Sequence, residues 1–182
     1  STTKDVTAFV AWSSLDSSVA TINPSGLAAA LKAGTALIHA SSGPIVSPNQ
    51  TLTVNNPVPT LVSVSPSLGV AGSGGFNLNL TGTMFVNGAT VMFGGHTIDT
   101  TFMDASHLTA VLPDAMIALP GSFTITVANP APSGGVSNGI AFEVLSAGQI
   151  IITSLSPANV QAGSPDLLLT VNGAGFTQYV TV

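Results

Sequence analysis

The residues of this chain that could take part in catalysis lie closest together in the segment Asp104-Ala105-Ser106-His107. This segment contains the three residue types of a Ser-His-Asp triad, in which an aspartate orients a histidine that deprotonates a serine. Adjacent residues of a β-strand point to opposite faces, however, so these side chains are not expected to converge. We therefore predict no catalytic residues and no enzymatic activity.

The histidines and acidic residues are too scattered for a metal site. His39, His96 and His107 are the only histidines, and the chain contains no cysteine. Zinc needs three or four convergent ligands, and the acids lack the alternating spacing of a calcium-binding loop. These acids are Asp5, Asp16, Asp99, Asp104, Asp114, Glu143 and Asp166. We predict no metal and no cofactor, and a calcium ion held at a module junction by aspartates and carbonyl oxygens is left as an alternative.

A glycine-rich segment, Gly69-Val-Ala-Gly72-Ser-Gly74-Gly75, has some likeness to a phosphate-binding loop. It departs from the GxGxxG spacing because Asn77 occupies the position of the last glycine. No helix is predicted after it to direct backbone amides at a phosphate. We interpret the segment as a turn.

The composition excludes several classes of partner. Charged residues make up 5% of the chain, the net charge is −5, and Lys4 and Lys32 are the only basic residues. Binding to nucleic acid or to anionic membranes depends on clusters of Lys and Arg. Apolar residues never run for the ~18 positions that membrane insertion requires. The absence of cysteine rules out a disulfide framework and is compatible with secretion by a bacterium.

One passage of the chain occurs twice. Residues 60–85 read TLVSVSPSLGVAGSGGFNLNLTGTMF, and residues 151–176 read IITSLSPANVQAGSPDLLLTVNGAGF. Pro66 pairs with Pro157 and Phe85 with Phe176, each 91 positions apart (157 minus 66) without a gap. A period of this length indicates tandem modules in an extended assembly.

The hydrophobic pattern predicts strands almost throughout. Apolar and polar residues alternate in Phe76–Leu80 and in Phe123–Val127, as in half-buried strands. Asn87-Gly88 and Asn138-Gly139 are dipeptides typical of hairpin turns. Short strands separated by Gly/Pro-rich turns predict antiparallel sandwiches. Two less regular segments are Leu27–Ala33, which we interpret as loop and strand, and Asp114–Leu119, which we expect to form a helical turn.

Residues 4–54 resemble the bacterial Ig-like domain, group 2. The residues that carry the resemblance are Asp5-Val6-Thr7, Trp12-Ser13-Ser14, Asp16–Ile22, Ser25-Gly26-Leu27 and Lys32–Ala36. The resemblance implies that Trp12 is a core residue rather than a platform for sugars. Members of this family normally begin with two further strands that are missing here.

Residues 60–145 are similar to an IPT/TIG domain, which is also Ig-like, and residues 151–182 resemble the start of a second one. The similarity is carried by Ser65-Pro66, Gly72, Leu80-Thr81-Gly82, Phe85, Val91, Phe93-Gly94-Gly95, Leu112-Pro113, Gly121, Val127 and Phe142. The second copy ends at Val182, which pairs with Val91 inside a predicted strand.

We therefore predict an all-β fold of tandem Ig-like β-sandwiches in three modules, at residues 1–56, 57–146 and 147–182. The linkers are Asn55–Pro59, which its prolines stiffen, and the more flexible Ser146–Gln149. Because the chain starts at Ser1 without a signal peptide, we expect it to be a processed or excised piece of a longer array. The alternative is that residues 151–182 complete the first module of the next subunit by strand addition, which would build a filament.

The two resemblances imply a structural role, since both families recur in bacterial adhesins and other surface proteins. We predict a stalk or surface fibre, extracellular or at the cell surface, whose partners are neighbouring Ig-like modules of the same or identical chains. One alternative is a module that binds a glycan or protein ligand. Another is a non-catalytic accessory region of a secreted carbohydrate-active enzyme.

Overall fold

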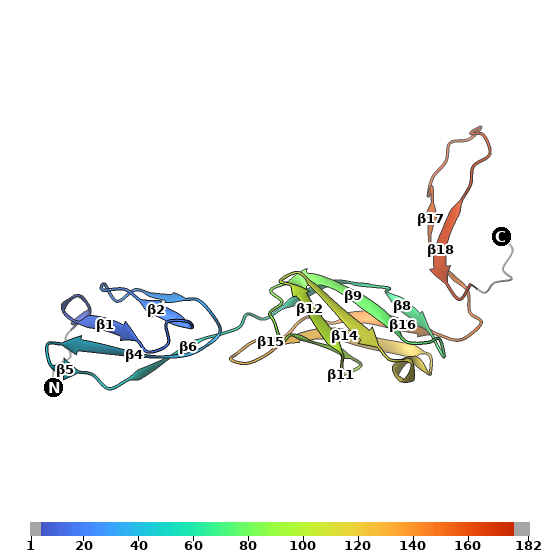
Figure 1. Ribbon diagram of the computed structural model, residues 1–182. Helices are drawn as coiled ribbons and strands as arrows, with labels where there is room; N and C mark the ends of the chain where they lie inside the picture. The colour runs from blue at the N-terminus through green and yellow to red at the C-terminus, as the bar shows by residue number, and fades with distance from the viewer. Residues whose placement is uncertain (1–4, 177–182) are drawn as a thin grey trace. The chain divides into compact units, whose positions relative to one another are not determined.

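The computed structural model describes residues 5–176, and every regular element in this range is a strand or a short 3-10 helix. The prediction of an all-β fold is confirmed (Figure 1). Within the described residues the chain divides into two compact units. One unit runs to Val58 and adds Asn129–Gly135, and the other takes the remaining residues. The described range has no helix with the length and apolar character that crossing a membrane requires.

The first unit contains a small sheet and a separate hairpin. The sheet is built on β4, which pairs with β1, β5 and β6, and the hairpin joins β2 and β3, all in antiparallel register. The elements are η1 (Thr7–Phe9), β1 (Ala11–Ser14), β2 (Ala20–Ile22), β3 (Ala28–Ala30), β4 (Gly34–Ser42), β5 (Ile45–Val46) and β6 (Gln50–Val54). The interpretation of Leu27–Ala33 as loop and strand is confirmed, because β3 lies there.

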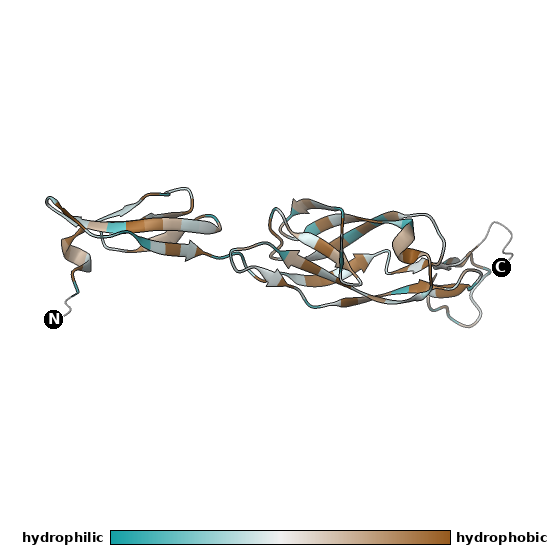
Figure 2. Cartoon of the chain, turned by 90° about the horizontal axis from the view of Figure 1, so that it is seen from below, coloured by the Kyte–Doolittle hydropathy of each residue, from teal (hydrophilic) through white to brown (hydrophobic). Residues whose placement is uncertain are grey.

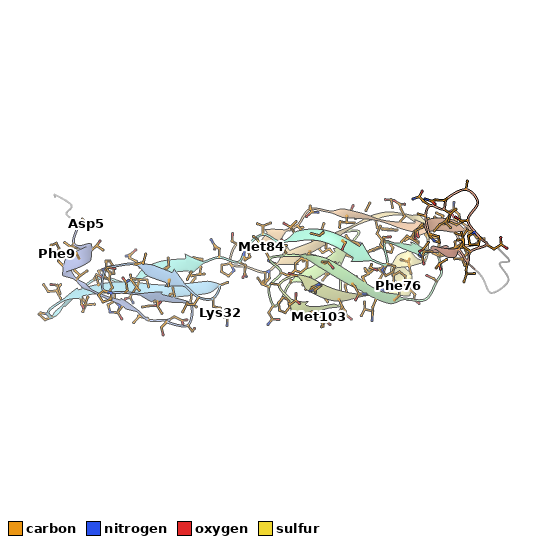
Figure 3. All side chains as sticks on the ribbon, turned by 90° about the horizontal axis from the view of Figure 1, so that it is seen from above. Asp5, Phe9, Lys32, Phe76, Met84 and Met103 are labelled. Atoms are coloured by element: carbon orange, nitrogen blue, oxygen red, sulfur yellow. The ribbon has the colours of Figure 1, made fainter. Side chains whose placement is uncertain are left out.

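The core of the first unit is small. Only three of its residues, Val19, Ala20 and Ala36, form the buried cluster. Apolar side chains remain on the surface, among them Phe9, which is 76% exposed (Figure 3), and Leu27, which is 70% exposed. Burial of apolar area is the main source of stability, so this unit has little of its own.

The second unit contains a complete two-layer sandwich. One sheet has the strand order β11-β10-β14-β16-β8, with β15 on β14, and the other has the order β12-β13-β9-β7. The bounds are β7 (Thr60–Ser65), β8 (Leu68–Val70), β9 (Phe76–Thr83), β10 (Thr90–Phe93), β11 (His96–Ile98), β12 (Thr100–Asp104), β13 (His107–Leu112), η2 (Asp114–Ile117), β14 (Gly121–Asn129), β15 (Gly135–Val136) and β16 (Ile140–Leu145). The expected helical turn after Leu112 is confirmed as η2.

Period-two patterning explains how the sandwich closes. Leu78 and Leu80 of β9 are at most 1% exposed, and Ile125 and Val127 of β14 are completely buried. Alternate residues of each strand thus face the partner sheet, as expected for packed sheets. Seventeen buried residues form one cluster here, against three in the first unit. Figure 2 shows hydrophobic and hydrophilic residues interspersed along these strands.

The hairpin of β17 (Ile151–Ser156) and β18 (Thr170–Ala174) repeats the pairing of β7 with β9. Val64 lies opposite Leu80, and Leu155 lies opposite Val171, residue for residue at the distance of the sequence repeat. The register irregularity between Leu61 and Ser63 recurs between Ile152 and Ser154. Residues that share a position in the sequence repeat therefore share a position in the fold. The last part of the predicted third module, residues 177–182, lies outside the described residues.

Candidate functional site

The structure brings together two of the three residues with triad chemistry. Asp104 ends β12 and lies opposite His107, the first residue of β13, across a tight turn. His107 Nδ1 is 2.9 Å from Asp104 Oδ1 and 3.0 Å from Oδ2. The strand argument does not apply to Asp104 and His107, because the chain reverses between them, but the prediction concerned the convergence of all three side chains as a triad.

Ser106 does not complete a triad. Its backbone N–H donates to Asp104 Oδ1 at 2.7 Å, and within residues 5–176 no hydrogen bond joins its hydroxyl to the His107 ring. The backbone N–H of Ser106, followed by the His107 ring, lowers the pKa of Asp104 below its ordinary value. Both side chains of the ion pair are more than half exposed, so the arrangement stabilises a turn at the surface.

The other two histidines lie on other strands. His39 is half-buried on β4, and its Nδ1 is buried without a hydrogen-bond partner. His96 is exposed at the start of β11. No group of three His, Cys, Asp or Glu residues in the described part of the chain could hold a metal ion.

Trp12 packs against Thr7 and Gly26 of the first unit. Its indole N–H donates to the carbonyl of Thr7 at 3.0 Å, and a Cβ at Gly26 would lie 3.2 Å from the same nitrogen. The resemblance implied that Trp12 is a core residue, but its side chain is only half-buried. The small core of this unit explains the difference, since few apolar residues are available to cover the ring.

The glycine-rich segment was predicted to be a turn, and the structure confirms this only in part, because Gly69 and Val70 belong to β8 and the turn begins at Ala71. Gly72 donates its N–H to the carbonyl of Ile117 at 3.0 Å, which ties the turn to η2. Asp114, the first residue of η2, accepts from the backbone N–H of Ala115 at 2.7 Å and lines the hollow beside Gly72. A carboxylate at this position opposes the binding of a phosphate.

A hollow of about 250 Å³ lies at one end of the β10–β11 hairpin and is lined by Phe93, Gly94, His96, Met116 and Phe123. Phe123 stacks on the buried Phe93 with ring centroids 4.7 Å apart. A Cβ at Gly94 would lie 3.2 Å from the Phe123 ring, and one at Gly121 3.4 Å from it. Because both positions are glycine, no side chain from them shields this ring. The sequence did not single out this hollow, although the Gly94-Gly95 dipeptide beside an aromatic residue was a usable signal.

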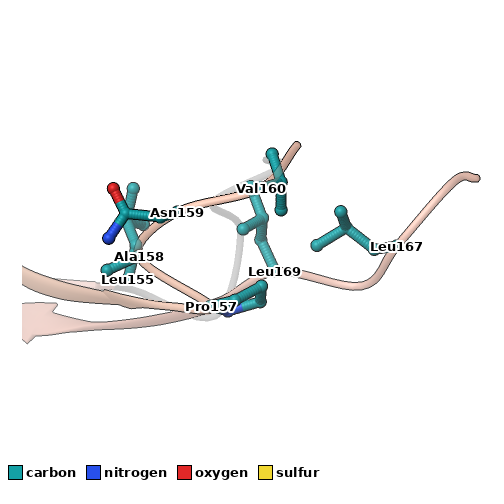
Figure 4. Close-up of a pocket in the computed structure, with 7 residues that line it drawn as sticks. All are labelled: Leu155, Pro157, Ala158, Asn159, Val160, Leu167 and Leu169. Carbon is teal, nitrogen blue, oxygen red and sulfur yellow. The ribbon is translucent and has the colours of Figure 1, made fainter. Parts of the chain in front are cut away.

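A second hollow, of about 270 Å³, lies beside β17 and is lined by six apolar residues and one asparagine (Figure 4). These residues are Leu155, Pro157, Ala158, Asn159, Val160, Leu167 and Leu169. Leu155 is 42% exposed and Leu169 is 49% exposed, whereas Val64 and Leu78, their equivalents in the sandwich, are 7% and 0% exposed. The same pattern of side chains is thus covered in one copy and uncovered in the other.

Positive charge is nearly absent from the surface. Lys32 is the only basic residue in the described range (Figure 3). The hydroxyl of Ser18 is the main cause of a lowered pKa at Asp16, and the charge of Lys32 contributes least. The surface therefore depends on neutral polar side chains for its solvation.

Comparison with known proteins identifies the sandwich. The family model described as the IPT/TIG domain matches residues 59–144. These residues are an IPT/TIG domain. Its bounds differ by one residue at each end from the bounds of the similarity found in the sequence, residues 60–145. The bacterial Ig-like module, the second TIG domain and the three module boundaries stay predictions.

One relative covers almost the whole chain. Ice-binding protein 1 of Shewanella frigidimarina is 32% identical over 166 residues, which are 91% of this chain and 15% of that protein. The chain therefore spans a small part of the relative's length.

Three solved structures are similar to parts of this chain. The TIG domain of human nuclear factor of activated T-cells, cytoplasmic 4, is 23% identical and has a TM-score of 0.38, covering 49% of this chain and 89% of its own. The surface-layer protein SbsC is 18% identical with a TM-score of 0.31, and the match covers 85% of this chain and 22% of that structure. The Bacteroides ovatus protein SGBP-B, solved with a mixed-linkage heptasaccharide, is 19% identical with a TM-score of 0.36. The match covers 78% of this chain and 39% of that structure.

Proposed function

We propose that this chain is a structural segment of a modular bacterial protein, extracellular or at the cell surface, whose Ig-like modules act as a stalk or surface fibre. The observation that carries the proposal is the repetition of the β7–β9 pairing by β17 and β18, residue for residue. Repetition of a domain-sized unit builds an array of modules. The TIG domain would be one complete unit of this array.

The flanking segments are further modules in this proposal. Residues 151–182 would begin a second TIG domain, supported by the shared register and by Phe176, which stands near Gly173 as Phe85 stands near Gly82. Residues 4–54 would be part of a bacterial Ig-like domain. The two-stranded sheet β2–β3, whose Ala28–Ala30 strand is exposed throughout, supports this by leaving a strand edge open.

We also propose that the uncovered faces bind Ig-like strands of neighbouring modules, from the same chain or from identical chains. Ile152 and Leu168 of the hairpin segment are 57% and 90% exposed, and Leu31 of the first unit is 61% exposed. Apolar surface next to an unpaired strand edge favours strand addition. This assembly requires no metal and no cofactor.

The surface chemistry supports a durable, non-catalytic role outside the cell. Trypsin-like proteases need Lys or Arg, of which the chain has two. Next to the exposed Asp104–His107 pair, Ser106 donates its backbone N–H to Asp104. This arrangement is suited to stabilising a turn.

The proposal is tested on the native polypeptide and on intact cells. Its mass under denaturing conditions should be far above 18.0 kDa if the modules form a covalent array, and close to that value if identical chains assemble. Antibodies against the TIG domain should label unpermeabilised cells or the medium. Labelling that appears only after permeabilisation would refute the extracellular role.

A second candidate function is ligand recognition at the hollow around Phe123. The exposed His96 beside a ring that neighbouring glycines leave open favours it, since aromatic rings with nearby polar groups suit sugar rings and apolar side chains. Oligosaccharides titrated into the ¹⁵N-labelled chain would shift the amides of Gly94 and Phe123. Loss of these shifts in Phe123→Ala would assign the site, and unchanged spectra would remove this candidate.

The name of the Shewanella relative refers to ice, which offers a direct test of binding by these modules. Purified chain would be added to an ice-recrystallisation assay at matched protein concentrations, with an unrelated Ig-like domain as control. A purely structural segment should behave as the control does. Inhibition of recrystallisation would assign ice binding to this segment and overturn the purely structural role.

A further inference from the structure

The connector between the predicted first module and the TIG domain is held by hydrogen bonds from a distant loop. Asn56 donates its backbone N–H to the carbonyl of Pro132 at 2.9 Å, and its own carbonyl accepts from the N–H of Gly134 at 3.1 Å. Asn56 thereby forms a parallel bridge with Ser133. The loop, residues 129–135, follows β14 and is more than seventy positions away in the sequence.

Two asparagine side chains strengthen this contact from opposite directions. The side-chain amide of Asn56 donates to the carbonyl of Pro130 at 2.9 Å. The side-chain amide of Asn129 donates to the carbonyl of Pro57 at 2.9 Å. Asn129 is only 5% exposed, and a buried amide that lost its partner would be costly. Each segment therefore supplies an asparagine that satisfies a backbone carbonyl of the other.

The sequence of the loop suits it to this contact. Pro130 and Pro132 have no N–H to donate, and their carbonyls accept from Asn56. Gly134 has a φ of +58°, a conformation that glycine adopts without strain. A Cβ at this position would collide with the carbonyl oxygens of Asn129 and Pro130. The loop can therefore close on the connector only with glycine here.

We infer that residues 129–135 are a strap that binds the connector residues Asn56–Val58 and holds them in one backbone conformation. Gly135 packs close to Val58, to which a Cβ would come within 3.3 Å, so the strap contacts the connector at Val58 as well as at Asn56 and Pro57, although Val58 stays 57% exposed. The strap thus reaches back to Asn56, three residues before the family match begins at residue 59. The inference goes beyond the proposed function, because the strap would act equally in a stalk and in a ligand-binding protein.

Amide hydrogen exchange of the full ¹⁵N-labelled chain tests the strap. The N–H groups of Asn56 and Gly134 should be protected in the wild type. Asn56→Ala and Asn129→Ala should each accelerate their exchange by about 5- to 30-fold, the factor that corresponds to losing one good hydrogen bond. Asn55→Ala is the matched control, because Asn55 is exposed and makes none of the strap's hydrogen bonds.

Several outcomes would overturn the inference. The first is that the amides of Asn56 and Gly134 exchange at unprotected rates in the wild type. The second is that these amides exchange at the same rate in the wild type and in all three variants. Protection of the Ile125 and Val127 amides in β14 reports whether the sandwich stays folded. If the buried Asn129→Ala variant loses this protection, the half-buried Asn56→Ala variant still decides the question.

Discussion

The contrast between Leu78 and Leu169 leads to a quantitative prediction. The two residues are of the same type and occupy equivalent positions of the repeat, but Leu78 is completely buried and Leu169 is 49% exposed. Replacing a fully buried leucine by alanine removes its transfer free energy and leaves a cavity, at a cost of about 3–5 kcal/mol. Leu78→Ala should therefore destabilise the TIG domain by this amount. Leu169 has only half of its transfer free energy to lose, so Leu169→Ala should cost about 1 kcal/mol or less.

Chemical and thermal unfolding followed by far-UV circular dichroism measure the difference. A domain of this size loses roughly 4–8 °C in Tm for each kcal/mol, so Leu78→Ala should lower Tm by more than about 10 °C. Leu169→Ala should lower Tm by less than about 8 °C. The single tryptophan, Trp12, lies in the other unit and reports separately on that unit.

Equal destabilisation by the two substitutions would refute the reasoning, because it would mean that the face of β17 and β18 is packed as tightly as that of β7 and β9. A cost below about 1 kcal/mol for Leu78→Ala would refute it as well. A cost at Leu169 that increases with protein concentration would instead show that identical chains cover this face, since association stabilises folded chains by mass action.

Three further predictions concern single positions of the TIG domain. Asn138→Ala removes both side-chain hydrogen bonds to the buried backbone of β7 (3.0 and 2.9 Å) and should cost about 2 kcal/mol in urea unfolding, whereas Asn87→Ala, also before a glycine, should be nearly neutral. Gly82→Ala would drive a Cβ into a β7 carbonyl and an aromatic ring and should lower Tm by several degrees or more; an unchanged Tm would contradict this. Because the folded pKa of Asp104 is lowered, its stabilisation is complete above the unfolded value near 3.8 and is lost as pH falls through the folded pKa. Asp104→Asn should therefore flatten the Tm profile below about pH 4, and a parallel profile would exclude this contribution.

The main features of the fold could be predicted from local patterns. Alternation in Phe76–Leu80 and Phe123–Val127 indicated strands, and these segments lie in β9 and β14. Family resemblance placed the TIG domain to within one residue at each end. These signals are readable because side-chain direction in a strand depends only on the positions of neighbouring residues.

The candidate sites depended on contacts that local patterns do not contain. Asp104 and His107 meet because a turn places them opposite each other, although strand periodicity alone would separate them. The hollow around Phe123 combines residues from β10, β11, η2 and β14. Such a site exists only after the sheet has formed.

The sequence by itself determined that the chain is all-β, that one passage recurs at a domain-sized period, and that the chain carries almost no positive charge. Only the tertiary structure decided which copy of the repeat buries its apolar residues. Leu78 and Leu169 share a pattern and a register, yet Leu78 alone is enclosed by the other strands of its sandwich. The strap on Asn56 is likewise a tertiary feature, since it joins backbone groups more than seventy positions apart. Burial and long-range hydrogen bonding depend on which segments meet in space, which periodicity along the chain does not specify.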